Sequence, residues 1–184
     1  MNQQVATAGA VPAHIIFFYV EESMFNNVTI RSMYRAKTIK DSAGESQVDD
    51  YAMSGDERDA FNIFLSKAVH EAFNIVMKMT TGIESALILN GDPDTIWPTT
   101  LPTGVLATDV VFGFKIKDHD AYNVNNISLV DEGIKSLIEN HILREWYEMV
   151  GHADEFAKWN AKYLESKRDL ISKRLFQLRK PMMN

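Results

Sequence analysis

The sequence predicts an α+β fold: three long amphipathic helices, a small and mainly antiparallel sheet, and long extended loops. Two observations predict it. Apolar residues recur at three- and four-residue spacing over 54–82 and again over 126–180, which is the period of a helix with one buried face. Short apolar runs, HIIFFYV at His14–Val20 and DVVFGFKIK at 109–117, have instead the length and composition of strands.

The composition fits one globular domain over residues 1–184. Hydrophobic residues make up 46% of the chain and cysteine is absent, so the fold relies on packing without disulfides or thiolate metal sites. Residues 1–13 lack the basic start and apolar core of a secretory signal, and we expect a mobile tail there. No apolar run approaches the ~18 residues that span a bilayer, so we expect a soluble protein with no membrane partner.

The first half of the chain is predicted to hold the strand His14–Val20, a polar turn at 21–27 and a hairpin partner at 28–39. Residues 40–53 are acidic and aperiodic, and we expect an extended loop or arm. Ser54 and Glu57 form a capping-box pattern that predicts the start of a long helix, which Gly82 would end. A strand at 83–89 follows.

Residues 90–108 contain three of the five prolines and are predicted to be a second extended loop or arm. Trp97 lies among these prolines. Two interpretations stay open: an arm that packs onto a neighbouring molecule, or a loop packed internally over the sheet. The strand at 109–117 comes next, with Gly113 expected at a bulge.

Residues 126–180 predict an antiparallel pair of helices. Ser128 with Asp131 is a capping pattern for the first helix, and Gly151 stands where a C-terminal glycine belongs. The second helix would begin near Asp154 and end at Pro181. A short break between two long helices forces a hairpin. Aromatic residues gather near this turn, and we expect them to lock the hairpin and not to bind a ligand: Trp146, Tyr147, Gly151, Trp159 and Tyr163.

Charge is unevenly distributed along the chain. Residues 162–180 hold seven basic and two acidic side chains, a net charge of +5. Since the whole chain has a net charge of −6, the remaining residues together carry −11. One interpretation is head-to-tail self-contact between a basic end and an acidic face. The other is a solvated last helix whose cations favour its C-terminus.

Catalytic motifs are absent from the sequence, which has no nucleotide-binding glycine loop and no G-x-S-x-G elbow. His70-Glu71 begins like a zinc-protease motif, but Asn74 stands where the second histidine is needed. The triplet at 118–120, Asp-His-Asp, has two interpretations: a metal-binding turn at the end of a strand, or a polar turn, which we expect because the sequence places no other ligands nearby. His141, Glu145, Glu148 and His152 share one helix face, either as half of a metal site or as a salt-bridged surface with Arg144. We predict no catalytic residue, metal ligand or cofactor, and no enzyme activity.

The hairpin resembles the closing segment of small virion proteins from tailed phages of Bacteroidetes, including crAss-like phages. In that pattern a helix ends near W-Y-x-x-x-G, and a second helix with spaced Tyr and Leu ends in a basic L-x-x-R-x-P stretch. The matching positions are Trp146, Tyr147, Gly151, Tyr163, Leu178, Arg179 and Pro181. The resemblance covers roughly residues 109–181, and its motifs are structural.

This resemblance implies a virion neck or head–tail connector protein, assembled in the host bacterial cytoplasm as a homo-oligomeric ring between portal and tail. Such rings are typically twelve-fold. Its partners would be the portal and other neck or tail proteins, with non-specific contact to packaged DNA as a further expectation. The alternatives are a non-catalytic regulatory or interaction module and a metal-dependent hydrolase. Candidate subunit or partner contacts are Trp97, Pro98, Lys173, Arg174, Arg179 and Lys180.

Overall fold

The computed structural model describes residues 14–79, 85–97, 100–117 and 126–174. Four long helices run through the molecule: α1 (Glu21–Ala36), α3 (Arg58–Met79), α5 (Ile127–Met149) and α6 (Ala153–Asp169). Short helical turns are α2 (Val48–Tyr51), a 3₁₀ turn at Gly55–Glu57, α4 (Pro93–Ile96) and a π-helical turn at Leu170–Arg174. The strands are β1 (His14–Val20), β2 (Ala86–Gly91) and β3 (Val111–Lys117). The predicted α+β class is confirmed.

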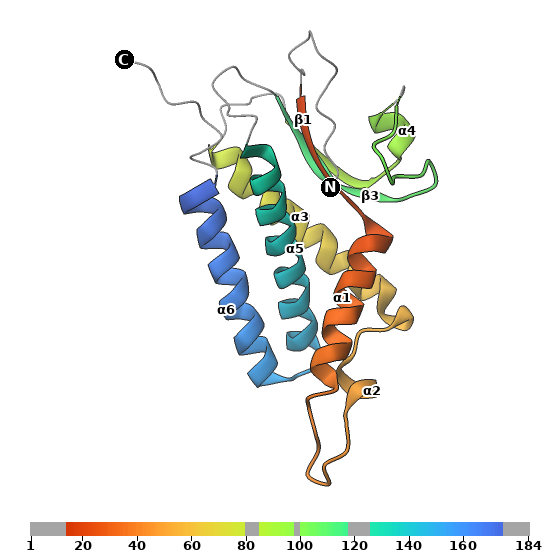
Figure 1. The fold of residues 1–184 in the computed structure, drawn as a ribbon, viewed down its shortest axis with the longest axis vertical. Coiled ribbons are helices and arrows are strands. Elements are labelled where there is room, and N and C mark those ends of the chain that lie inside the picture. Colours follow the sequence, from red (N-terminus) through yellow and green to blue (C-terminus); the bar gives the residue numbers. More distant parts are fainter. Residues whose placement is uncertain (1–13, 80–84, 98–99, 118–125, 175–184) are drawn as a thin grey trace.

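The three strands form one antiparallel sheet in the order β1-β3-β2, near one end of the long helices (Figure 1). Because strand side chains alternate between faces, Phe17 on β1 and Phe114 on β3 point into the main core that the helices line. Phe18 points to the opposite face, where it packs with Ile88 and Trp97 in a second, smaller core. The sheet is therefore covered on both faces.

Gly113 occupies the middle of the central strand, directly opposite Phe18 on β1. Its φ is +156°, and a Cβ at this position would lie 2.0 Å from the carbonyl oxygen of Phe17. Only glycine lets β1 and β3 approach this closely. The expected bulge lies on the neighbouring strand β2, where the register shifts between Ile88 and Gly91 around Asn90, whose φ is +51°.

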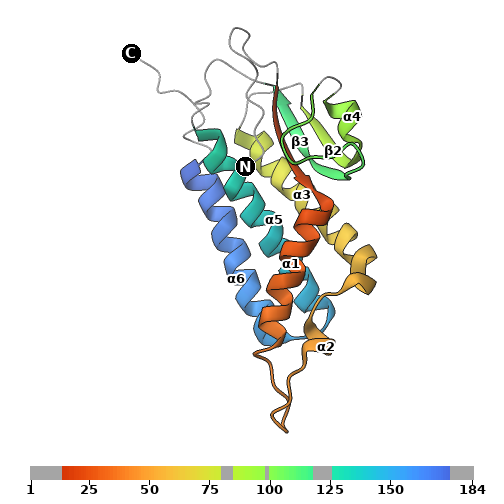
Figure 2. The same ribbon diagram turned by 45° about the vertical axis from the view of Figure 1, so that its right-hand side comes forward.

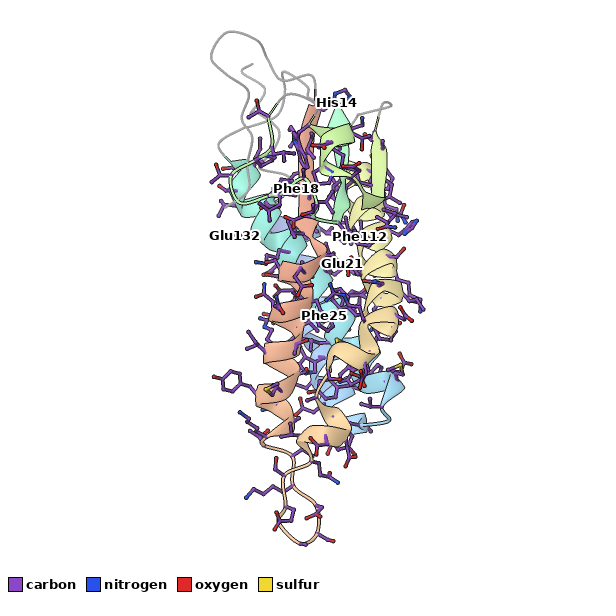
Figure 3. The ribbon with its side chains drawn as sticks, turned by 90° about the vertical axis from the view of Figure 1, so that its right-hand side faces the viewer. His14, Phe18, Glu21, Phe25, Phe112 and Glu132 are labelled. Carbon is purple, nitrogen blue, oxygen red and sulfur yellow. The ribbon has the colours of Figure 1, made fainter. Side chains whose placement is uncertain are left out.

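Helix α1 corrects the prediction of a turn at 21–27 followed by a hairpin strand. Figure 3 shows β1 running into α1 without a loop, through Phe18, Glu21 and Phe25. The buried residues recur at helical spacing, which places them on one face that packs into the core: they are Met24, Phe25, Val28, Ser32 and Ala36. Of the β-branched and aromatic residues that favoured a strand, Ile30 and Tyr34 are exposed, whereas Val28 is buried.

The segment 40–53 is only partly the predicted arm. Residues 40–46 form a small exposed hairpin, closed by a bridge between Lys40 and Ser46, that projects at the end of α1 (Figure 1). The chain then returns through α2, and Met53 is fully buried. The Trp146 Nε1–H donates a 2.8 Å hydrogen bond to the Tyr51 carbonyl, which fixes this return to α5.

One of the two predicted capping patterns is present in the structure and the other is not. At Ser54 and Glu57 the reciprocal capping box is present, as predicted. At α5 the N-cap is Asn126, without a side-chain cap, so the capping role assigned to Ser128 and Asp131 is wrong. The Asp131 carboxylate instead accepts a 3.1 Å hydrogen bond from the Tyr19 hydroxyl, which links α5 to β1.

The predicted antiparallel hairpin of α5 and α6 is confirmed (Figure 1). Gly151, with φ +73°, follows the end of α5. Its N–H donates to the Glu148 carbonyl at 3.2 Å, and the His152 N–H donates to the Tyr147 carbonyl at 3.0 Å. This pair of bonds is the Schellman arrangement, which favours glycine at the left-handed position.

Other predictions fall partly outside the described residues: the tail at 1–13, Gly82, the triplet at 118–120 and the last helix beyond Arg174. No helix in the described part of the chain combines the length and the apolar character needed to cross a bilayer.

Candidate functional site: a polar cluster and a basic groove

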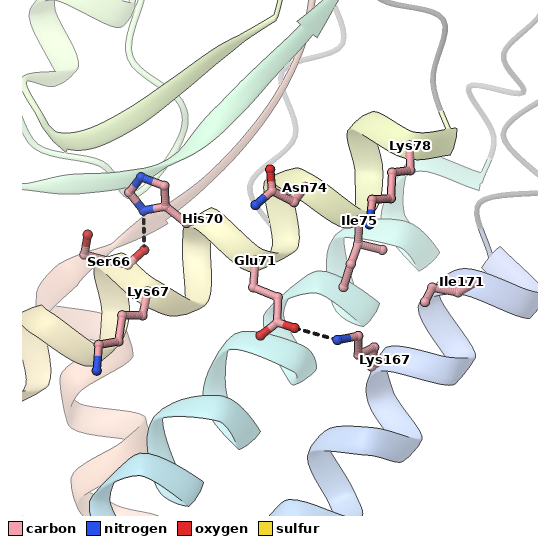
Figure 4. Close-up of a pocket in the computed structure, with 9 residues that line it drawn as sticks. All are labelled: Ser66, Lys67, His70, Glu71, Asn74, Ile75, Lys78, Lys167 and Ile171. Atoms are coloured by element: carbon pink, nitrogen blue, oxygen red, sulfur yellow. Dashed lines mark hydrogen bonds and ion pairs between the residues drawn. The ribbon is translucent and has the colours of Figure 1, made fainter.

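A cluster of ionisable side chains lies where α3, α5 and α6 meet. Glu71 comes from α3, His141 from α5, and Tyr163 and Lys167 from α6. The Glu71 carboxylate accepts a hydrogen bond from the Tyr163 hydroxyl. It accepts another from Lys167 Nζ at 2.7 Å (Figure 4). Tyr163 and Lys167 are four residues apart and therefore share one face of α6.

His141 is buried between two carboxylates. Its Nδ1 lies 3.1 Å from Glu71 Oε2, and its Nε2 lies 3.8 Å from Glu145 Oε1. Within the described part of the chain Nε2 has no hydrogen-bond partner. The ring packs edge-on against Tyr163, with centroids 5.4 Å apart. The predicted contact between His141 and Glu145 is thus present, although on a buried face of the helix.

Glu145 extends the cluster to its other side. It pairs with Arg144 on α5 and, at 3.3 Å, with Lys67 on α3. The predicted salt-bridged surface does not join Arg144 to Glu148, which is exposed. Arg144 pairs instead with Glu145, and its Cζ lies 4.4 Å from the centroid of the Tyr163 ring. The cluster therefore connects three helices and not only adjacent turns of one.

The electrostatics favour a charged Glu71 and a neutral Tyr163. The hydrogen bond with His141 holds the pKa of Glu71 well below its usual range, with further lowering by Lys167 and Tyr163 that outweighs its burial. Burial and then the Glu71 carboxylate raise the pKa of Tyr163. The Glu71 hydrogen bond also raises the pKa of Lys167. At neutral pH Glu71 is therefore charged and Tyr163 neutral, and their hydrogen bond joins α3 to α6.

A groove of about 710 Å³ opens beside this cluster, between the C-terminal halves of α3 and α6 (Figure 4). Ile75 and Ile171 contribute its apolar surface. Three lysines and one glutamate contribute its charge, so the lining is net positive; the complete lining is Ser66, Lys67, His70, Glu71, Asn74, Ile75, Lys78, Lys167 and Ile171.

A second polar contact joins α1 to the hairpin. Arg31 donates to Glu139 on α5 at 2.6 Å, and Arg35 donates to Glu155 on α6 through both its Nε and its Nη2. Both glutamates are buried. Buried carboxylates require such charged partners, so these pairs fix where α1 can sit.

The comparisons with known proteins assign no relative. No family model, curated protein or solved structure matches this chain.

The alternative of half a metal site on this face of α5 is not supported by where its residues lie. His152 caps the start of α6, with Nδ1 accepting from the Glu155 N–H at 3.3 Å, and its ring packs against Tyr51. Glu148 points to solvent. Among the residues that the structure describes, no group of three or more His, Asp or Glu side chains is arranged to hold a metal ion.

The proposed hairpin-lock aromatics are all buried, but they contact several elements. Trp146 bonds to Tyr51, and the Tyr147 hydroxyl donates to the Ser32 carbonyl on α1 at 3.4 Å. Trp159 packs beneath Lys162, whose Nζ lies 4.0 Å from its ring centroid, and beneath Arg31.

The proposed partner-contact residues are distributed differently from the expectation. Trp97 is buried against Phe18, with ring centroids 4.6 Å apart, which matches the internally packed alternative for 90–108. The backbone of Lys173 and Arg174 belongs to the π-helical turn that follows α6. Pro98, Arg179 and Lys180 lie outside the described residues.

We predict that Glu71→Gln lowers the free energy of unfolding by about 2 kcal/mol at pH 7, the order of hydrogen bonds to a charged group. Because the folded-state pKa of Glu71 is depressed, its contribution is present above the unfolded value of about 4.3 and is lost as pH falls below it. Urea unfolding at pH 7 and pH 3 measures the difference between wild type and variant, which should shrink at the lower pH.

Glu148→Gln is the matched control, because Glu148 is exposed on the adjacent helix α5. Its unfolding free energy should follow that of the wild type at both pH values. Equal stability of Glu71→Gln and wild type at pH 7 would contradict the role of Glu71 as the centre of the cluster.

Proposed function

We propose that this chain is a structural virion protein of a tailed phage, a neck or head–tail connector whose copies form a ring between portal and tail. The resemblance of residues 109–181 to such proteins supplies the class. On this structure, the observation that supports assembly best is an apolar surface on α1.

This α1 surface consists of Ile30, Met33 and Tyr34, whose exposed fractions are 52%, 39% and 69%. They lie at i, i+3 and i+4, which places them together on one helix face. The face lies opposite the buried residues Val28 and Ser32. An exposed apolar group of this kind, rimmed by polar residues, is typical of a protein–protein contact.

Helix α1, which carries this surface, is held firmly against the two helices of the hairpin. The salt bridges of Arg31 and Arg35 hold the polar side of α1 to α5 and α6. Because these contacts already fix the helix, its outer face loses little conformational entropy when it binds another molecule. The second copy of the chain is the occupant that the connector role requires.

The test is to replace the two most exposed members of the surface. In the connector account Ile30→Glu with Tyr34→Glu converts assembled protein to monomer, because charges would be buried in the subunit contact. Light scattering after size-exclusion chromatography measures the mass, and circular dichroism checks that the monomer stays folded. Leu164→Glu, on the exposed face of α6, is the control with the same chemistry and should leave assembly unchanged.

If the double variant still assembles, the surface on α1 is not part of the contact between subunits. A wild-type chain that stays monomeric but binds another protein would favour the regulatory or interaction module instead.

A further inference from the structure

Two features of opposite net charge lie at opposite ends of the molecule: residues 40–46 carry −1, from Asp41 and Glu45 against Lys40, and the groove lining carries +2, from three lysines against Glu71. The exposed hairpin at 40–46 projects beyond the lower ends of α1 and α2 in Figure 1, while the basic groove lies between the upper ends of α3 and α6 (Figures 1 and 2). We refer to these as the acidic hairpin and the basic groove. Their separation along the long axis prevents contact within one subunit.

The basic groove has unused positive charge. Lys67 and Lys167 pair with Glu145 and Glu71. Lys78 is exposed at the end of α3 and forms no ion pair with any side chain in the described ranges. It lies beside Ile75 and Ile171, so the groove offers a cation next to an apolar surface (Figure 4).

The acidic hairpin is ordered by its own backbone. Asp41 Oδ1 accepts from the N–H groups of Ala43 and Glu45, each at 2.9 Å. The Asp41 N–H donates to the Glu45 carbonyl at 3.0 Å, and Gly44, with φ +86°, closes the turn. The bridge between Lys40 and Ser46 completes the loop. A loop that is already shaped loses little entropy when it docks.

The hairpin's acidic side chains remain accessible. Asp41 and Glu45 are exposed at the tip, and Asp49 and Asp50 follow on the first turn of α2, also exposed. Since Asp41 is engaged by the backbone, Glu45 is the carboxylate at the tip that is most available to a partner.

We infer that the acidic hairpin of one copy docks in the basic groove of a second copy, with Glu45 facing Lys78. This inference rests on the proposed ring-forming function and names one of its contacts. A contact between two different surfaces of identical subunits is head-to-tail, and such contacts close into rings when the rotation between neighbours allows it. This charged contact would fix how two neighbouring copies align, in addition to the apolar contact proposed for α1.

A protein segment fits the groove better than nucleic acid does. Binding along a phosphate backbone draws on many cations with few intervening acids. Here Glu71 and two isoleucines share the lining with the lysines, and the chain as a whole carries −6. A short acidic loop with a compact tip needs only a local cation and a small apolar contact.

Charge exchange tests the pairing in the full-length chain. Lys78→Glu and Glu45→Lys, each alone, should weaken assembly by about tenfold in subunit concentration, as for other close charge pairs at interfaces. The double variant Lys78→Glu/Glu45→Lys should recover assembly. An equimolar mixture of the two single variants should also recover assembly. In alternating copies, one contact joins the native Glu45 to the native Lys78, and the next joins the introduced lysine to the introduced glutamate.

Lys115→Glu and Glu148→Lys are the controls, since they make the same charge changes at exposed positions on β3 and α5. Sedimentation velocity at 50 and 300 mM NaCl reads the subunit concentration at half-assembly, and salt should weaken the wild type as it screens the pair. Single variants that assemble like the wild type, or single defects that neither the double variant nor the mixture repairs, overturn the inference while the ring proposal stands. A wild type that never assembles overturns the ring proposal itself.

Discussion

Gly113→Ala is expected to lower the free energy of unfolding by about 4 kcal/mol, the range of severe single substitutions. The added Cβ would lie 2.0 Å from the Phe17 carbonyl oxygen and 2.7 Å from the Phe18 Cα. Both atoms belong to backbone, so no side-chain rotation relieves the clash. The pairing of β1 with β3 must loosen, and this pairing carries the sheet because β3 is its central strand.

Thermal unfolding followed by circular dichroism measures this effect, with an expected fall in Tm of roughly 10 °C. Gly55→Ala is the matched control, because a Cβ at Gly55 meets nothing within 4 Å and its backbone suits any residue. The control should unfold within a degree or two of the wild type. A Gly113→Ala protein as stable as the control would contradict the close approach of the two strands.

Trp97→Ala is expected to lower the free energy of unfolding by about 3 kcal/mol, the usual range for removing a buried aromatic side chain. Trp97 packs edge-on against Phe18 and belongs to the smaller core with Val105 and Val111. In the described part of this loop, residues 100–110, Val105 belongs to the same core and Leu101 packs against it, so the core attaches the loop to the sheet.

Limited proteolysis together with urea unfolding of the monomer measures this effect, since cleavage of the released loop should accelerate. Leu106→Ala is the control, because Leu106 lies in the same loop with 64% of its surface exposed. A Trp97→Ala monomer of unchanged stability that fails to assemble would support instead the arm that reaches a neighbouring subunit.

The elements that could be predicted from sequence are those whose buried residues follow one period without interruption. The runs His14–Val20 and 109–117 have few polar residues on either face, because β1 and β3 contribute to two cores. The hairpin could be predicted from the short break at Gly151, whose Schellman bonds require a residue that tolerates a positive φ.

Helix α1 could not be predicted in the same way, because apolar residues occupy both of its faces. Val28 and Ala36 face the core, whereas Ile30 and Tyr34 face solvent in this subunit. Because apolar residues from both faces are interspersed with polar ones, the helical period is obscured. The sequence pattern then resembles that of a strand rich in β-branched residues. In the assembly proposed here this second set would also be buried, in the contact between subunits.

The polar cluster was only partly accessible from sequence. The four-residue spacings of His141 with Glu145 and of Tyr163 with Lys167 are visible as local pairs. That both pairs meet Glu71 depends on how α3 packs against the hairpin, which no local spacing specifies. A polar residue within the apolar period of α3 is the one signal that marks such a position in advance.

The central claim is that the chain assembles into a closed ring. Native mass spectrometry of the purified full-length protein tests it most directly, because the method counts subunits. The account predicts one dominant species with a fixed number of copies, most simply twelve times the 20.9 kDa subunit. A 20.9 kDa monomer at every concentration, with no larger species of defined stoichiometry, would contradict it.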